Sequence, residues 1–292
     1  MAARSWEPDP VLVGVDGSEA STRAVRWAAR EAGLRGTGLH VVHAWLWPLF
    51  HVPLGGSPVA PPGSGLQAEA DRILAGAAAT ARAVAPDIVV ETTLAVGEAG
   101  AELLRRARGA QLVVVGSRGL GGFTGLLLGS TGIALSAHSP RPVVVARGDE
   151  TPHGPVVAGV DGSPGADAVL RRAFGEAALH GSEVLVVHSW SVGLHLVPLA
   201  AEGYERVERA ARDHAEELVD KALSRVTPDF DAVKVSVLLA ESSAAADLVT
   251  ASRSARLLVV GSRELGFVQG MLLGSTTHAL LHHAACPVFV ER

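Results

Sequence analysis

One glycine pattern occurs twice in the chain, at a constant distance. The first copy reads VVVGSRGLGGFTGLLLGS at residues 113–130, and the second reads LVVGSRELGFVQGMLLGS at 258–275. The offset between Asp16 and Asp161, 145 residues, recurs when VGVDGS is matched to AGVDGS and VVHAW to VVHSW. This offset is the length of a domain and far exceeds the roughly 20–50 residues of a solenoid repeat. Two similar domains are therefore expected, at residues 1–148 and 153–292, joined by a polar, turn-rich linker.

Within each copy, short apolar runs alternate with segments of helical character. Hydrophobic residues make up 48% of the chain, so each half can bury a core. Unbroken apolar runs are typical of strands buried on both faces of a parallel sheet. The alternation predicts an α/β fold: two tandem, doubly wound open parallel sheets of the Rossmann-like or flavodoxin-like type. In the first domain, strands are expected at 11–15, 39–44, 88–95, 112–115 and 143–146, and helices at 19–34, 66–84, 98–108 and 124–138.

Helix signals appear in both domains. Ser18 is expected to cap the first helix, and Pro164, after Ser163, is a suitable first residue for its counterpart. A long, charged helix is expected at 204–223, with a solvent-facing surface.

Charge and composition exclude several classes of partner. The formal net charge is −5 and the only lysines are Lys221 and Lys234, which argues against general binding to nucleic acid or anionic membranes. One cysteine, Cys286, excludes an intramolecular disulfide and a multi-cysteine zinc site. We see neither a secretory signal near the N-terminus nor a membrane span, so a cytoplasmic protein is expected.

Polar and glycine residues follow the expected strands where ligands of such sheets bind. Asp16, Ala44 and Gly116 lie at strand carboxyl ends. Glycines let the backbone approach a phosphate closely, and a helix N-terminus favours its negative charge. One wall of a phosphate site is expected from Gly116, Ser117, Arg118 and Gly119, and a second from Gly129, Ser130 and Thr131. No lysine lies near these glycines, which excludes a Walker A loop, and Thr124 occupies the third glycine position of the dinucleotide motif.

The pattern G-x2-G-x9-G-[ST], after VVVG and together with VGVDGS and VVH, resembles the universal stress protein family over essentially the whole chain. The resemblance implies domains similar to the adenine nucleotide alpha-hydrolases, usually loaded with ATP, with or without Mg²⁺. It also implies a nucleotide-dependent regulator of stress response, dormancy or growth, with little or no turnover.

The resemblance further implies roles for individual residues. The Gly14 backbone and Asp16 would lie beside the nucleotide, with Asp16 acting directly or through metal or water, and the Ala44 backbone would contact adenine. The two glycine walls would hold the phosphates. The matching positions of the second domain are Gly159, Asp161, Ser189, Gly261, Ser262, Arg263, Gly274, Ser275 and Thr276. Glu264 replaces the middle glycine there, and its carboxylate is expected to crowd and repel phosphate. We therefore expect a strong first site and a weak or altered second one.

Other functions remain open at this point. A slow ATPase, autokinase or adenylate-handling enzyme could use Asp16 with Mg²⁺, although no base, catalytic lysine or other catalytic residue is evident. A flavodoxin-like redox module is disfavoured, because aromatic residues make up only 4% of the chain. His43 and His188 are better explained as packed strand-end residues than as bases, and no metal site is expected from His278, His282 and His283.

Partner surfaces are less defined. Trp45 and Trp190 suit either the wall of a base site or core packing, and residues 45–65 suit a flap, a partner surface or a simple connection. The fifth strands, at 143–145 and 288–290, are expected at sheet edges, where the resemblance implies pairing of the two domains. A homodimer and an unidentified regulatory protein partner are also expected.

Overall fold

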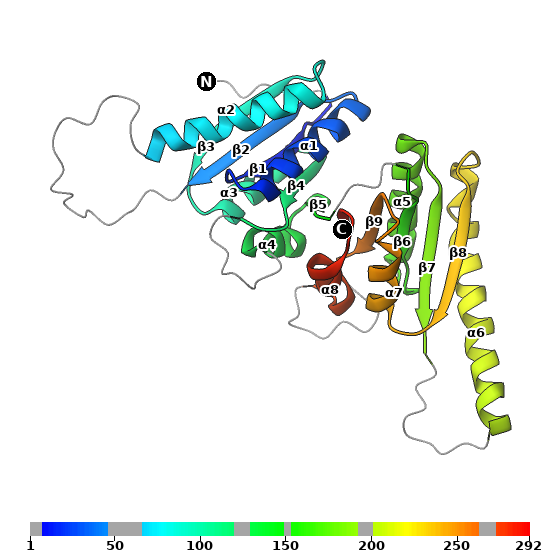
Figure 1. Cartoon of the computed structure of the whole chain (residues 1–292). Helices are drawn as coiled ribbons and strands as arrows, with labels where there is room; N and C mark the ends of the chain where they lie inside the picture. Colours follow the sequence, from blue (N-terminus) through cyan, green and yellow to red (C-terminus); the bar gives the residue numbers. More distant parts are fainter. Residues whose placement is uncertain (1–7, 46–65, 120–128, 149–152, 192–200, 263–272) are drawn as a thin grey trace, which may run out of the picture. The chain divides into compact units, whose positions relative to one another are not determined.

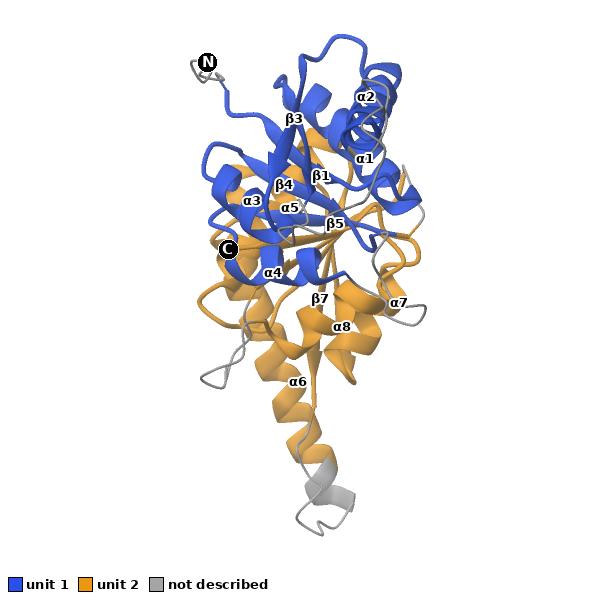
Figure 2. Cartoon of the chain, turned by 90° about the vertical axis from the view of Figure 1, so that its left-hand side faces the viewer, with its two compact units in different colours: residues 1–147 blue, residues 148–292 orange. Residues whose placement is uncertain are grey.

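The chain divides into two compact units, Met1–Arg147 and Gly148–Arg292, coloured separately in Figure 2. The computed structural model describes residues 8–45, 66–119, 129–148, 153–191, 201–262 and 273–292. Each unit is an α/β domain with its own parallel sheet (Figure 1).

The sheet of the first unit has the strand order β3-β2-β1-β4-β5, and every neighbouring pair is parallel. The chain proceeds outward from β1 in both directions, which places the topological switch point between β1 and β4. The apolar residues of β1, β4 and β5 are buried, as the unbroken apolar runs predict. The strands are β1 (Val11–Val15), β2 (Leu39–Trp45), β3 (Val90–Val96), β4 (Leu112–Gly116) and β5 (Val143–Ala146).

Four helices connect these strands: α1 (Glu19–Leu34), α2 (Leu66–Val84), α3 (Ala99–Ala107) and α4 (Ser130–His138). Helix α1 packs against α2, and α3 packs against α4, so each face of the sheet carries one pair. Ser18 is the N-cap of α1, and its Oγ accepts a hydrogen bond from the Ser21 amide at 3.1 Å. Gly17, just before the cap, has φ +86°, a conformation that strongly favours glycine.

The second unit repeats this arrangement, with the strand order β8-β7-β6-β9-β10 and parallel pairing throughout. Its strands are β6 (Val156–Gly159), β7 (Val184–Trp190), β8 (Val235–Glu241), β9 (Leu257–Gly261) and β10 (Val288–Glu291). Its helices are α5 (Ala166–His180), α6 (Ala201–Ser224), η1 (Thr227–Asp229), α7 (Ala244–Ala251) and α8 (Ser275–His283). Among the described helices, none is both long and apolar enough to cross a membrane.

The start of α5 differs from the sequence prediction. Pro164 was expected to be its first residue, but Gly165 is the N-cap and Ala166 begins the helix. The Ser163 amide donates to Asp161 Oδ1 at 2.9 Å, and the Ser163 carbonyl accepts from the Ala166 amide at 3.0 Å. These bonds close a turn around Pro164 and delay the helix by two residues.

Candidate functional site

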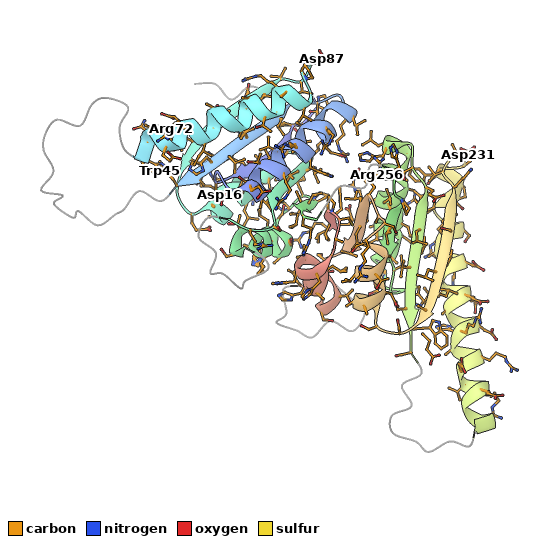
Figure 3. The ribbon with its side chains drawn as sticks, viewed as in Figure 1. Asp16, Trp45, Arg72, Asp87, Asp231 and Arg256 are labelled. Carbon is orange, nitrogen blue, oxygen red and sulfur yellow. The ribbon has the colours of Figure 1, made fainter. Side chains whose placement is uncertain are left out.

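A cavity of about 350 Å³ opens at the carboxyl ends of β1, β2 and β4 in the first unit. Asp16 lies in this region, just beyond the end of β1 (Figure 3). The cavity sits at the switch point, where ligands of open α/β sheets bind. Of the ten residues predicted for the first site, nine line it: Gly14, Asp16, Ala44, Gly116, Arg118, Gly119, Gly129, Ser130 and Thr131. Ser117 does not line the cavity, and its side chain is buried.

A backbone hydrogen bond holds the two glycine walls together. The Gly129 amide donates to the Ser117 carbonyl at 2.9 Å, which fixes the start of α4 beside the end of β4. Gly129 is the N-cap of α4 and supplies no side-chain hydrogen bond to the helix. The first amide groups of α4 therefore remain as donors for an anion, and Ser130 and Thr131 border the cavity there.

Gly116 allows the closest backbone approach at the site. A Cβ on this residue would come within 2.7 Å of the carbonyl carbon and oxygen of Ala20. Because both contacts are backbone atoms, a side chain at position 116 would push β4 away from α1. The glycine at the end of β4 is therefore required by packing as well as by access to the cavity.

Asp16 lies where the first wall meets the start of α1. Its Oδ1 accepts a hydrogen bond from the Ser18 amide at 3.0 Å, and its Oδ2 lies beside Gly119, where an added Cβ would approach within 2.5 Å. The Ser18 hydroxyl donates to the Arg118 carbonyl at 3.4 Å, which links the α1 cap to the same wall. The backbone thus orients the carboxylate at the end of the cavity that the two glycine walls enclose.

The other end of the cavity is apolar and depends partly on α3, which the sequence analysis did not assign to the site. Ala99 and Leu103 lie four residues apart on one face of α3, and both line the cavity. A Cβ on Gly14 would come within 2.6 Å of Leu103 Cδ1, so this glycine lets α3 pack closely on β1. The same 145-residue offset pairs them with Ala244 and Leu248, a signal that could have identified them. The other unassigned lining residues are Val15, Ser21, Val42, Val115 and Gly132.

The strand-end histidines form structural hydrogen bonds. His43 Nδ1 donates to the Val15 carbonyl at 2.7 Å, and His188 Nδ1 donates to the Val160 carbonyl at 2.8 Å. Each bond ties the second strand of a unit to the end of the first strand. Neither histidine nor Trp45 or Trp190 belongs to the described lining of either cavity.

The matching cavity of the second unit is smaller, at about 80 Å³. Of the predicted residues, Gly159, Asp161, Gly261 and Thr276 line it, whereas Ser189, Ser262, Gly274 and Ser275 do not. Arg263 and Glu264 lie outside the described residues, as do residues 46–65 of the expected flap. The lining residues that the sequence analysis did not assign are Val160, Ser163, Gly165, Ala166, Val169, Val187, Ala244, Leu248, Val260 and Thr277.

Side chains account for part of this difference in volume. Thr277 occupies the position of Gly132 and is buried, and its hydroxyl donates to the Gly261 carbonyl at 2.7 Å. Val169 replaces Ala24 in the helix that follows the first strand. Larger side chains therefore extend into the region that small residues leave open in the first unit.

A polar cluster stands in the second unit at the position that Ala44 occupies in the first. Ser189, the counterpart of Ala44, donates its hydroxyl to Asp247 Oδ2 at 2.7 Å, and Ser242 donates to the same oxygen. The Ser189 side chain is thus directed to α7 and not to the cavity.

Comparison with known proteins covers both units. Residues 8–147 and 153–292 each match the family model described as the Universal stress protein family. Universal stress protein Rv2005c from Mycobacterium tuberculosis is 34% identical over 295 residues, covering 97% of this chain and 96% of that protein. A universal stress protein from Mycolicibacterium smegmatis is 33% identical over 293 residues, with the same coverage of both chains.

A solved structure shares the fold over nearly the full length. The crystal structure of a universal stress protein from Archaeoglobus fulgidus has a TM-score of 0.69 and 20% identity, covering 97% of this chain and 98% of that one. The tandem α/β architecture therefore extends to a distant relative.

Proposed function

The chain belongs to the universal stress protein family, and we propose that it is an ATP-binding regulator whose first unit holds the nucleotide. The observation that carries this proposal is the cavity at the β1/β4 switch point, where the two glycine walls converge with three strand ends. Its volume of about 350 Å³ lies within the range of about 300–1,000 Å³ typical of small-molecule sites.

The phosphates would lie between the two glycine walls. Donors there come from the start of α4, whose N-cap has no side chain, and the helix dipole adds favourable charge. Arg118 borders the same end of the cavity and supplies a guanidinium group suited to oxyanions. The adenine would lie at the apolar end, against Val42 and Leu103, with the Ala44 backbone at its edge.

Asp16 is the residue best placed to hold Mg²⁺. Its carboxylate borders the phosphate end, and an unscreened carboxylate there would repel the nucleotide. Asp16 would hold a Mg²⁺ ion, which prefers carboxylate and phosphate ligands and would supply the positive charge that offsets this repulsion. The residues present therefore fit a magnesium–nucleotide complex.

The second unit would bind nucleotide weakly. Its cavity of about 80 Å³ has space for only a few water molecules, and Thr277 and Val169 narrow it. The sequence adds Glu264 at the position of Gly119. With one site occupied per chain, the bound nucleotide would stabilise one conformation of the first unit. A nucleotide-dependent regulator acts in this way.

Matched variants test this proposal. Asp16→Asn and Asp161→Asn make the same change at equivalent positions, and ATP binding is measured by calorimetry with Mg²⁺ and with EDTA. Mg²⁺ is expected to strengthen ATP binding by wild type and Asp161→Asn but not by Asp16→Asn. Equal effects of the two substitutions, or no ATP binding by the wild type, would overturn it. Bound ATP should also persist for hours. Its conversion to ADP or AMP within minutes would instead indicate a slow ATPase, autokinase or adenylate-handling enzyme.

A further inference from the structure

The open edge of β8 in the second unit exposes different side chains from those usual at the edge of a sheet. Strand β8 lies at one end of the strand order in the second unit and pairs with β7 on one side. Within the described residues, no strand of this unit pairs with its other side. Its backbone donors and acceptors on that side are therefore open to another strand.

Apolar side chains are exposed on both faces of this edge. Val235 and Val237 are 38% and 43% exposed, and Leu238, which points to the opposite face, is 41% exposed. Natural proteins usually protect an edge strand with charged or polar residues. The centre of β8 has none.

The matching edge strand of the first unit does carry this protection. Three successive residues of β3, Glu91, Thr92 and Thr93, are replaced in β8 by Ser236, Val237 and Leu238. Both strands are seven residues long and occupy the same place in their sheets. The difference is therefore specific to the second unit and not a requirement of the fold.

The sheet surface beside this edge is also more apolar in the second unit than in the first. In the first unit, His40 Nε2 and Thr93 Oγ1 form a hydrogen bond of 2.9 Å between β2 and β3. The counterparts of these residues are Leu185 and Leu238, which share one face of the sheet because Val187 pairs with Leu238. A polar pair has become an apolar one beside the open edge.

The charged residues at the two ends of β8 indicate which partner would cover its open edge. Lys234 precedes the strand and Glu241 ends it, and both are exposed. When two copies of β8 pair antiparallel, the basic end of each lies near the acidic end of the other. Parallel pairing would bring like charges together.

Helix α6, which runs along β8 in Figure 1, also carries its charges unevenly along its length. Residues 205–212 contain three arginines and two glutamates, whereas residues 213–224 contain four acidic residues and one lysine. A two-fold axis at the β8 edge would set the two α6 helices on the same face of the joined sheet. They would run antiparallel, with the weakly basic half of each towards the strongly acidic half of the other.

We propose that a second copy of this chain docks on β8, with the two strands paired antiparallel around a two-fold axis. Pairing buries Val235, Val237 and Leu238 and joins the sheets of the two second units. The α6 helices add charge complementarity beside the new strand pair. This interface involves neither cavity and is independent of nucleotide.

The oligomeric state of the full chain tests the proposal. Sedimentation velocity is measured over a range of concentrations for wild type, Val237→Lys and its matched control Thr92→Lys. Both substitutions place a lysine at an exposed edge position, so both should leave the fold intact, which thermal unfolding checks. Wild type and Thr92→Lys are expected to be dimers, and the dimer dissociation constant of Val237→Lys should rise at least 100-fold. A monomeric wild type, or a dimer unaffected by Val237→Lys, would overturn the proposal.

Cysteine cross-linking tests the orientation of the strands. The native Cys286 is buried, so introduced thiols can be followed under mild oxidation. Leu238→Cys, near the middle of β8, should give covalent dimers, whereas Thr93→Cys should not. Glu241→Cys should cross-link with Val235→Cys in a mixture but not with itself, because these two side chains share a face and lie opposite each other when Leu238 pairs with its own copy. Self-cross-linking of Glu241→Cys, or none by Leu238→Cys, would contradict antiparallel pairing.

Discussion

Gly119 lies against Asp16 at the mouth of the first cavity, so closely that a Cβ on Gly119 would come within 2.5 Å of Asp16 Oδ2. The second unit has Glu264 at this position. This close contact explains how one substitution could make the second site bind nucleotide more weakly than the first. A glutamate at the position of Gly119 would add a second negative charge next to Asp16 and the phosphates.

Gly119→Glu should therefore abolish most ATP binding by the first unit. Both crowding and charge repulsion act against the phosphates, and a loss of at least tenfold in affinity, about 1.4 kcal/mol, is expected. Calorimetric titration with ATP measures it. Gly119 is exposed, so the thermal unfolding temperature should change little. Wild-type affinity in this variant would show that the phosphates do not lie between the glycine walls.

Gly129→Ala should weaken ATP binding without a clash in the free protein. The nearest atoms to an added Cβ are the Gly119 nitrogen at 3.9 Å and the Arg118 Cα at 4.0 Å, so the methyl group fits but narrows the space between the walls. We expect about a tenfold weaker affinity. Gly274→Ala is the control, because Gly274 is the N-cap of α8. Both should lose up to about 1 kcal/mol of stability, since alanine is a poor N-cap, but only Gly129→Ala should lose nucleotide.

Gly116→Ala should destabilise the first unit through a backbone clash. A Cβ would lie within 2.7 Å of Ala20 backbone atoms and 2.9 Å of the Ser21 amide nitrogen. Overpacking of this kind typically costs about 1–3 kcal/mol. Gly76→Ala is the contrasting variant, because no atom lies within 4 Å of its Cβ position in α2, and it should stabilise by about 0.5–1 kcal/mol. Thermal melts compare the two, and equal shifts would contradict the close approach of β4 to α1.

His40 should make the first unit less stable in mild acid. Burial lowers the pKa of His40 below its usual 6.5, the nearby Arg106 lowers this pKa further, and Glu91 partly opposes both. The unfolded chain therefore takes up this proton more readily than the folded chain. The stabilising contribution is present above pH 6.5 and is lost as the pH falls through the folded-state pKa.

His40→Gln should reduce this pH dependence, because glutamine can keep a hydrogen bond to Thr93 but does not titrate. Unfolding temperatures of wild type and variant are compared at pH 8 and pH 5.5, after removal of nucleotide. The wild type should lose more stability between these values than the variant does. Identical losses would show that His40 does not contribute to the acid sensitivity.

Much of the fold followed from local signals in the sequence. The bounds of α1 and α2 agree with the predicted 19–34 and 66–84, since Ser18 caps α1 and apolar periodicity extends through both helices. Strand β3 begins at Val90 and not at residue 88, because the Ile88 amide bonds to the Ala85 carbonyl in a preceding turn. Helix α4 begins at Ser130 in the described chain, and the earlier residues of its predicted range, 124–128, are not described.

The candidate site was predictable only in part. Glycines and strand ends mark the backbone at the carboxyl edge of a sheet, so nine of the ten residues predicted for the first site line the first cavity. Leu103 and Ala99 were missed because their role depends on how α3 packs on β1, a tertiary contact that Gly14 permits. In the second unit, the narrowing of the cavity by Thr277 also depends on packing, which the repeated motif does not reveal.

The nucleotide content of the purified protein tests the central proposal most directly. The full chain is denatured, the released nucleotide is identified by chromatography, and its amount is divided by the amount of protein. We expect ATP at close to one molecule per chain in the wild type and close to none in Gly119→Glu. Two molecules per chain, or a full complement retained by Gly119→Glu, would contradict a single nucleotide site in the first unit.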